Sequence, residues 1–554
     1  MRILLLAHSF NSLTQRLYAE LLRKGHEVSV EFDIHDDVTV EAVDRYRPDL
    51  ILAPFLKRAI PEAIWKAHTC LVLHPGIRGD RGPSALDWAI LEAEREWGVT
   101  VLQADAEMDA GPIWATRRFP LRDAKKSSVY RSEVTEAGVA ALREAVEKFA
   151  AGDFAPEPLD PALSRWRPLM PQEARAIDWG RDDTATVLRK IRAADGFPGV
   201  LDELLGEPVL LFDAHPEGGL KGAPGAILGQ RRGALCLGTV DGAVWITHLK
   251  QKAADSFKLP AAKVLEAKLA GVPELPEHDG QTWRDIRYEE AGGVGYLHFD
   301  FYNGAMGTEH CHRLREAFDE ASRRPIRVLV LMGGADFWSN GIHLNLIEAD
   351  PNPADESWRN INAMNDLARA VITNGRQLTV SALQGNAGAG GVFLSLAADR
   401  VYARQGVVLN PHYKGMGNLY GSEYWTYLLP RRVGQEKARA LTRNRLPVLA
   451  EEAAEWGLLD GCFGDGREAF LAEIRQRAEA LAASPDFGAQ LAEKNRRRAE
   501  DEAIKPLEAY REEEMAHMKL NFYGFDPSYH VARSNFVRKV PRSRTPLYLA
   551  RHRA

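Results

Sequence analysis

The sequence predicts a multidomain protein of the α/β class whose first domain contains an open parallel sheet. Short apolar segments alternate with helix-like segments at the start of the chain, which is the order of a doubly wound parallel sheet. The chain has 554 residues, more than one hydrophobic core usually serves. Two breaks, a proline-rich stretch at 156–171 and a polar stretch at 272–280, divide it further.

The opening domain is expected to follow a regular alternation of strand and helix. The expected strands are 3–7, 28–32, 50–54 and 70–73, and the expected helices are 13–24, 40–46 and 62–67. A longer helix is expected over 84–97, followed by a fifth strand at 99–103. Ligands of such sheets bind beyond the carboxyl ends of the parallel strands, so we expect a site at that edge.

His74 and Asp109 follow the fourth and fifth expected strands, and we expect both on the ligand side of the sheet. A histidine beside a carboxylate can transfer a proton, although a lone histidine at a strand end is more often only a hydrogen-bonded polar group. No GxGxxG sequence follows the first strand, which argues against a dinucleotide cofactor.

Composition excludes several classes of function. Hydrophobic residues make up 45% of the chain and charged residues 27%, as in ordinary globular proteins. A net charge of -6 gives no basic field for nucleic acid, and no apolar run reaches membrane-spanning length. The cysteines Cys70, Cys236, Cys311 and Cys462 are widely spaced, without a CxxC pair. We expect a cytoplasmic protein without a metal site, a nucleic-acid partner or a membrane partner.

Two glycine-centred turns dominate the second half of the chain. They are FWSNGIH at 337–343 and QGNAGAGG at 384–391, each placed after an apolar segment. Glycine allows the backbone to approach a ligand closely, and free N–H groups at the start of a helix suit an oxygen that gains negative charge. The simpler alternative is that these glycines close ordinary loops.

From about residue 292 to 464 the chain resembles the crotonase (enoyl-CoA hydratase/isomerase) superfamily. The resemblance rests on the two glycine turns, followed by NPHYKGMG and AEEAAEWGLLD in the same order. It implies a ββα spiral that binds an acyl-CoA thioester. It also places the two oxyanion N–H donors on Ile342 and Gly390, with Gly391 in the substrate site.

The departures from that superfamily argue against hydration. Phe393 and His412 stand where hydratases carry acidic residues, and hydration needs carboxylates to position and deprotonate water. Tyr413 and Glu423 remain as a candidate acid/base pair, with His412 as a lesser candidate. Tyrosine would donate a proton, and a glutamate whose pKa is raised by burial would accept one. The alternative is that both are hydrogen-bonded core residues.

Residues 1 to about 265 resemble the 10-formyltetrahydrofolate-dependent formyltransferases, through HPGIRGDRGPSALDWAI and GVTVLQADAEMDAGPI. The resemblance implies that His74 and Asp109 are catalytic, and that a small β-barrel of OB type follows the first domain. The asparagine that this family carries two positions before the histidine is Val72 here. The polar residues that could replace it in the first loop are Ser9, Asn11 and Gln15.

The order of the two halves resembles a family of [NiFe]-hydrogenase maturation factors. The resemblance implies a role in supplying the carbon monoxide ligand of that hydrogenase. From the two halves together we hypothesise that a formyl group passes from 10-formyltetrahydrofolate to coenzyme A, and that formyl-CoA is then decarbonylated to carbon monoxide. Arg131 is a candidate for binding the CoA phosphates. The implied partners are these small molecules and the hydrogenase large subunit or its maturation proteins. An amine or sugar formyltransferase with a CoA-sensing second half, a formyltetrahydrofolate hydrolase and a non-enzymatic scaffold remain alternatives.

The expected domains are a catalytic domain at 1–155, a proline-rich strap at 156–175, an OB-like domain at 176–270, a linker at 271–285, a crotonase-like domain at 286–464, and a helical, basic extension at 465–554. Within the extension, the charge-rich stretch 493–518 is expected to be one solvated helix.

Overall fold

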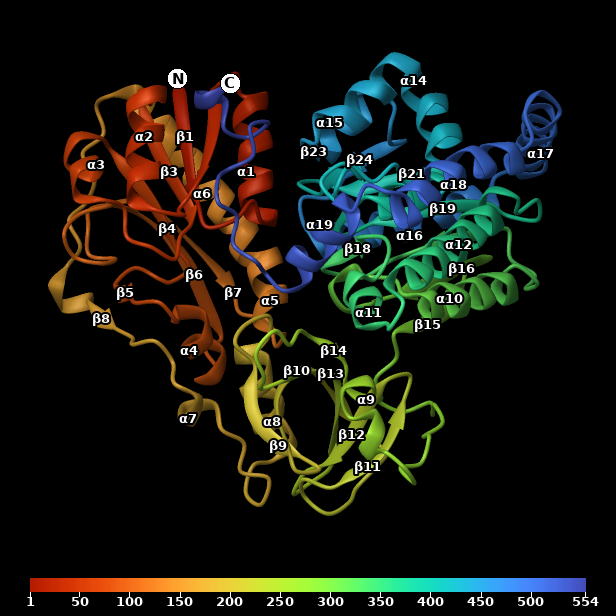
Figure 1. The fold of residues 1–554 in the computed structure, drawn as a ribbon, viewed down its shortest axis with the longest axis horizontal. Helices are drawn as coiled ribbons and strands as arrows, with labels where there is room; N and C mark the ends of the chain where they lie inside the picture. Colours follow the sequence, from red (N-terminus) through yellow and green to blue (C-terminus); the bar gives the residue numbers. More distant parts are fainter. The chain divides into compact units, whose positions relative to one another are not determined.

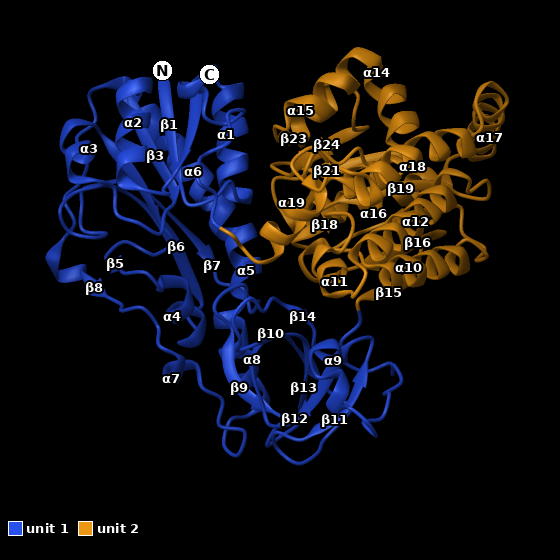
Figure 2. Cartoon of the chain, in the orientation of Figure 1, with its two compact units in different colours: residues 1–284, 541–554 blue, residues 285–540 orange.

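The computed structural model describes residues 1–554, which form two compact units (Figure 2). The first unit contains residues 1–284 together with 541–554, and the second contains residues 285–540. Figure 1 shows the order of the elements along the chain. None of the helices combines the length and the apolarity that a membrane span requires.

The main sheet of the first unit has the strand order β2-β1-β3-β4-β6-β7. Its strands are β1 (Arg2–Ala7), β2 (Glu27–Phe32), β3 (Leu50–Phe55), β4 (Cys70–His74), β6 (Glu96–Gln103) and β7 (Ile113–Pro120). The first four are parallel, as predicted, and are almost entirely buried. β6 runs antiparallel to both β4 and β7, so the expected parallel direction of the fifth strand is wrong.

The connection between β4 and β6 explains this difference. The helix expected over 84–97 is only α4 (Ala85–Leu91), and Ala93 follows in a left-handed conformation. A short helix does not carry the chain back along the sheet, as a parallel crossover requires. The chain therefore stays near the carboxyl end of β4, and Trp97 enters the core from a strand.

Helices and a curved second sheet complete the first unit (Figure 1). The helices of the main sheet are α1 (Ser12–Arg23), α2 (Asp36–Tyr46), α3 (Glu62–Ala67), α5 (Lys126–Val129), the π-helical turn η1 (Tyr130–Val134) and α6 (Thr135–Ala151). The strap contributes β8 (Arg165–Trp166), which pairs with β5 (Asp80–Arg81), and α7 (Gln172–Arg175). The strap is thus fastened to the loop that follows His74.

The second sheet of this unit is antiparallel, in the order β11-β12-β13-β10-β9, with β14 paired to β13. Its elements are α8 (Thr184–Ala194), β9 (Val200–Leu204), β10 (Glu207–Glu217), β11 (Ile227–Arg231), β12 (Ala234–Gly238), β13 (Ala243–Gln251), β14 (Leu259–Pro260) and α9 (Ala261–Val264). Apolar side chains of α8, including Val187 and Ile191, pack on this sheet to form a separate core.

The second unit is built from two sheets, and in the middle of the unit the strands of the two sheets alternate along the chain. The larger sheet has the order β15-β16-β17-β19-β21-β24, and the smaller has the order β18-β20-β22-β23. The strands are β15 (Ile286–Ala291), β16 (Val294–Phe299), β17 (Val328–Leu331), β18 (Phe337–Ser339), β19 (Leu378–Leu383), β20 (Asn386–Gly388), β21 (Arg400–Arg404), β22 (Val408–Asn410), β23 (Val448–Leu449) and β24 (Gly461–Phe463). From β17 to β22 each turn of the chain thus adds one strand to each sheet, and the smaller sheet aligns the two glycine turns.

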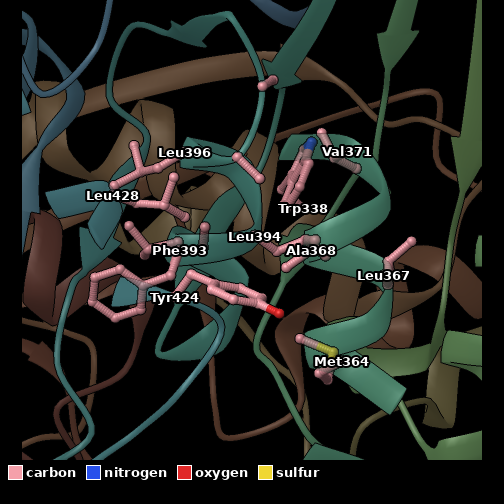
Figure 3. Close-up of a cluster of buried hydrophobic side chains, with 14 of the residues drawn as sticks. Trp338, Met364, Leu367, Ala368, Val371, Phe393, Leu394, Leu396, Tyr424 and Leu428 are labelled. Atoms are coloured by element: carbon pink, nitrogen blue, oxygen red, sulfur yellow. The ribbon is translucent and has the colours of Figure 1, made fainter. Parts of the chain in front are cut away.

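Helices surround these sheets and fill the core. They are α10 (Thr308–Ala321), α11 (Leu344–Ala349), α12 (Pro353–Ile372), α13 (Gly390–Leu396), α14 (Trp425–Asn444), α15 (Ala450–Glu455), α16 (Arg467–Ala483), α17 (Phe487–Ile504), α18 (Leu507–Tyr523) and α19 (Ser528–Val537). Figure 3 shows Phe393 and Tyr424 among apolar side chains of this core, with Met364 and Leu367 of α12 nearby.

The charge-rich stretch 493–518 is two helices rather than the one that was expected. α17 has no buried residue and matches the solvated helix of the prediction, but α18 buries Met515, Met518 and Phe522. Pro506 separates the two helices, because it cannot continue the hydrogen-bond ladder of α17. The prediction is therefore wrong for α18, which belongs to the core of the unit.

Candidate active sites

The first candidate site is centred on His74, which ends β4 and is 4% exposed. Its Nε2 lies 2.9 Å from Asp80 Oδ2, and its Nδ1 lies 3.5 Å from Asp109 Oδ2. Asp109 has a left-handed backbone, and its Oδ2 accepts the N–H of Gly82 at 3.0 Å. The histidine is thus held between two carboxylates, one at each ring nitrogen.

Asp109 reaches His74 by a route that the sequence did not indicate. Because β6 is antiparallel to β4, Gln103 at its end lies opposite Leu71 rather than beside His74. The loop that follows must therefore turn back toward His74. Arg81 stabilises this position of the loop, because its guanidinium donates hydrogen bonds to the Glu107 carboxylate and the Met108 carbonyl oxygen.

Asp80 is a member of this site that the sequence reasoning missed. It is buried, and its second oxygen lies 2.8 Å from Nε of Arg167, a buried arginine of the strap. Gly76 is also required, because a Cβ there would lie 2.4 Å from His74 Nε2. The aspartate was visible in the motif HPGIRGD, but nothing in the sequence indicated that Arg167 would return to it.

The polar first loop lies at the same edge of the sheet as His74. Since β3 separates β1 from β4, the backbone of this loop is two strand spacings from that of β4, roughly 10 Å. Asn11 Oδ1 accepts the N–H of Thr14 as the N-cap of α1, and Gln15 donates to the Phe10 carbonyl oxygen at 2.8 Å. Both side chains therefore already make local hydrogen bonds.

Three other predicted positions in this unit are partly buried. Ser9 lies in the first loop, and Val72 lies on β4 two positions before His74. Arg131 lies on the π-helical turn η1, which follows α5 directly. Lys125, at the start of α5, binds Asp213 of the second sheet at 2.8 Å and so fixes the segment that leads to Arg131.

The second candidate site forms where the two glycine turns meet. β18 and β20 are parallel neighbours, with Ser339 opposite Ala387. A Cβ on Gly341 would lie 3.2 Å from the nitrogen of Gly390, and a Cβ on Gly391 would lie 2.1 Å from the Ser339 carbonyl oxygen. A Cβ at position 391 would overlap the backbone, and Gly341 has a positive φ of 77°, so glycine is required at position 391 and favoured at position 341.

The N–H groups of Ile342 and Gly390 are close to each other and donate to no protein acceptor. Gly390 is the first residue of α13, and Ala389 before it has a positive φ of 48°. That conformation is costly for a residue with a Cβ and is found mainly where function requires it. Two free donors of this kind can bind one carbonyl oxygen.

Glu423 places a carboxylate beside these donors. A Cβ on Gly390 would lie 2.2 Å from Glu423 Oε1, so this oxygen faces the Gly390 backbone directly. The hydroxyl of Tyr413 donates to the other oxygen, Oε2, and lies 3.0 Å from the Ser422 carbonyl oxygen. Both side chains are buried, at 1% exposed for Glu423 and 8% for Tyr413.

Burial sets the protonation states of this pair. It raises the pKa of Glu423 to about 8, although the hydrogen bond from Tyr413 opposes the shift. Burial, together with the neighbouring Glu423 charge, raises the pKa of Tyr413 well above its usual value. At neutral pH Tyr413 can therefore only donate, whereas Glu423 can gain or lose a proton.

The sequence resemblance assigns Phe393 and His412 to the two positions where hydratases carry acids. The ring of Phe393 stacks on Tyr413 with centroids 5.2 Å apart, so it packs the pair rather than binding water. His412 has no hydrogen-bond partner at either ring nitrogen, and burial lowers its pKa to about 4. Its imidazole is therefore neutral at pH 7 and lacks the negative charge of the carboxylate that it replaces.

Known proteins match the chain in three consecutive parts and as a whole. Residues 15–146 match the formyl transferase family, residues 169–262 match the formyl transferase C-terminal domain, and residues 289–520 match the enoyl-CoA hydratase/isomerase family. The hydrogenase maturation factor HoxX of Bradyrhizobium diazoefficiens is 58% identical over 555 residues, which cover 100% of this chain and 97% of that protein.

The crystal structure of HypX from Aquifex aeolicus in complex with tetrahydrofolic acid has a TM-score of 0.98 and 53% identity, covering 100% of this chain and 99% of that one. The chain belongs to the HypX family of hydrogenase maturation factors. This confirms the predicted resemblance and the predicted fold class. The first half of this HypX-family chain is also 27% identical over 230 residues to methionyl-tRNA formyltransferase of Citrifermentans bemidjiense, covering 41% of the chain and 71% of that enzyme.

Proposed function

We propose that this HypX-family protein makes carbon monoxide for hydrogenase maturation in two steps. The first unit transfers the formyl group of 10-formyltetrahydrofolate to the thiol of coenzyme A, and the second decarbonylates the resulting thioester. The observation that carries the proposal is the position of Glu423 beside two free N–H donors, in a crotonase-type site without hydratase carboxylates. The tetrahydrofolic acid in the Aquifex aeolicus HypX structure supports the choice of formyl donor.

In the first step the thiol sulfur attacks the formyl carbon, and the bond from that carbon to N10 of the folate breaks. The thiol proton ends on N10, so the products are a formyl thioester and tetrahydrofolate. His74 would carry this proton, because Asp80 and Asp109 orient its ring. We propose Arg131 as a group that binds the anionic end of coenzyme A.

In the second step the N–H groups of Ile342 and Gly390 would hold the formyl oxygen and direct the C–H bond toward Glu423. Glu423 removes the formyl proton while the carbon–sulfur bond breaks, which releases carbon monoxide and a thiolate. The proton then returns to the sulfur, so nothing is oxidised or reduced overall. Tyr413 would remain protonated and stabilise the Glu423 carboxylate by its hydrogen bond.

The test is to incubate the purified protein with 10-formyltetrahydrofolate and coenzyme A, and to trap carbon monoxide with haemoglobin. We expect a carbon monoxide signal that requires both substrates. Formate alone would indicate hydrolysis, and formylation of an added amine would indicate an ordinary transferase. No turnover would favour a non-enzymatic scaffold that docks the hydrogenase large subunit or a maturation protein. If carbon monoxide is formed, we propose that one of these proteins receives it.

A further inference from the structure

The turn that carries Glu423 has an unfavourable backbone. Glu423 and Tyr424 are consecutive non-glycine residues with positive φ angles of 57° and 59°. A left-handed conformation costs about 1–2 kcal/mol for each residue with a Cβ, so other contacts must stabilise this turn. Tyr424 is the N-cap of α14, so this turn joins Glu423 to the start of that helix. The backbone of the turn therefore sets the direction of the Glu423 carboxylate.

Glu514, a completely buried glutamate of α18, provides these contacts. Its Oε2 accepts the N–H of Tyr424 at 3.0 Å and lies 3.2 Å from Ser422 Oγ. Its Oε1 accepts the N–H of Thr426 at 2.9 Å and the Thr426 hydroxyl at 2.6 Å. Both oxygens of one carboxylate are thus used to hold residues 422–426.

Asn365 of α12 holds the same turn from another helix. Its Oδ1 accepts the N–H of Glu423 at 2.8 Å and lies 2.9 Å from Ser422 Oγ. The hydrogen bonds of Glu514 go to residues 422–426, and those of Asn365 go to Ser422, Glu423 and Met515, so neither side chain bonds Ile342 or Gly390. The turn is therefore fixed by two buried side chains that stand behind the candidate site.

We propose that Glu514 is a positioning residue of the second site, which holds the turn 422–426 so that the Glu423 carboxylate faces Gly390 and Tyr413. The inference rests on the proposed function, because it assigns Glu514 a role in the same decarbonylation. Glu514 does not touch the substrate in this scheme. It acts through its hydrogen bonds to the backbone of the turn and through its own charge.

The charge of Glu514 gives this role a measurable signature. Burial raises the pKa of Glu514 to about 7, and its negative charge in turn raises the pKa of Glu423. The other titratable groups that face the two carboxyls are Tyr413, Tyr420 and Cys311, and burial raises the pKa of each. They are uncharged near neutral pH, so Glu514, whose pKa is about 7, is the neighbour whose charge acts on Glu423 as the pH rises.

The substitution Glu514→Gln tests the proposal. The amide NH₂ group of glutamine cannot accept the backbone N–H groups that one carboxylate oxygen of Glu514 accepts. The substitution also removes the negative charge of this side chain. We expect kcat for carbon monoxide formation to fall roughly ten- to a hundredfold with little change in KM. The acidic limb of the pH–rate profile should also move to lower pH. Glu513→Gln, an exposed glutamate on the same helix, is the matched control and should leave both unchanged.

A second measurement does not depend on activity. The titration of Glu423 can be followed by the infrared band of its carboxyl group, assigned with Glu423→Gln, and its midpoint should be lower in Glu514→Gln than in the wild type. If the wild type makes no carbon monoxide, the proposed function fails while this shift still supports the positioning role. An unchanged titration and an unchanged kcat in a folded Glu514→Gln variant would overturn it.

A milder variant serves if Glu514→Gln does not fold. Thr426→Val removes only the hydroxyl that donates to Glu514 at 2.6 Å and keeps the backbone N–H. The pKa of Glu514 would then rise, because the Thr426 hydroxyl stabilises its ionised form. Glu514 would carry less negative charge, so the titration midpoint of Glu423 should fall, by less than in Glu514→Gln. A midpoint identical to that of the wild type would contradict the proposal.

Discussion

At the scale of single residues, Glu423 combines a buried carboxyl group with a neighbouring donor and two free backbone N–H groups. We expect Glu423→Gln to lower carbon monoxide formation by roughly 100-fold or more, because an amide cannot accept the formyl proton. Coenzyme A-dependent release of tetrahydrofolate should continue, since His74 is untouched. Haemoglobin trapping and a folate assay on the same sample check both results. Unchanged carbon monoxide formation would remove Glu423 from the mechanism.

The raised pKa of Glu423 also predicts a pH dependence of stability. Its pKa is about 8 in the folded protein, against about 4.5 for an unperturbed glutamate. The folded state therefore binds more protons than the unfolded state between these values, and this group's contribution to stability falls as pH rises through that window. Urea unfolding at pH 5 and pH 8 should show Glu423→Gln gaining stability relative to the wild type at the higher pH. An unchanged difference would contradict the raised pKa.

In the first site, Asp80 is the residue whose removal is most informative. Asp80→Asn keeps the size of the side chain but weakens the partner of His74 Nε2. We expect coenzyme A-dependent release of tetrahydrofolate to slow roughly ten- to a hundredfold, as when an orienting group of a catalytic side chain is lost. The exposed Asp153→Asn is the control and should retain the wild-type rate. Equal rates for both variants would show that Asp80 is only structural.

At the scale of elements, α18 connects the charge-rich end of the chain to the second site. Met518 on this helix is completely buried, and its Sδ lies 3.2 Å from the N–H of Gly421, just before the turn that carries Glu423. Met518→Ala should lower the free energy of unfolding of this unit by about 2–5 kcal/mol. Leu520→Ala, at a position that is 65% exposed on the same helix, should change it by less than about 0.5 kcal/mol. Urea denaturation compares the two, and equal effects would contradict the packing of α18.

At the scale of the whole molecule, the last residues of the chain pack against its N-terminal sheet. The C-terminal segment 541–554 lies along β2, which is the edge strand of the first sheet. Val30 donates its N–H to the Leu549 carbonyl oxygen at 3.0 Å, and Phe32 donates its N–H to the Thr545 hydroxyl at 2.8 Å. An uncovered edge strand invites pairing with other chains, so this segment protects the first unit.

His552 is the side chain that anchors this segment, because it lies 2.9 Å from the completely buried carboxylate of Glu31. His552→Ala should lower the free energy of unfolding of the first unit by about 1–3 kcal/mol, since Ser29 loses its hydrogen bond to the ring and the buried Glu31 carboxylate loses its neighbouring imidazole. Arg544→Ala breaks only an exposed pair with Glu41 and should leave the melting temperature unchanged. Thermal unfolding and light scattering measure both variants, and a His552→Ala protein as stable as Arg544→Ala would refute this anchoring role.

The sequence by itself determined the features that are local in the chain. The apolar periodicity of the first four strands, the two glycine turns and the motifs around His74 and Glu423 each lie within a short segment, so a reader of the sequence can identify them. The tertiary structure decided the antiparallel direction of β6, because a short α4 leaves the chain at one edge of the sheet. It also decided which remote side chains support each site. Arg167 behind His74 and Glu514 behind Glu423 come from segments with no motif of their own, and only folding brings their charges to a buried partner.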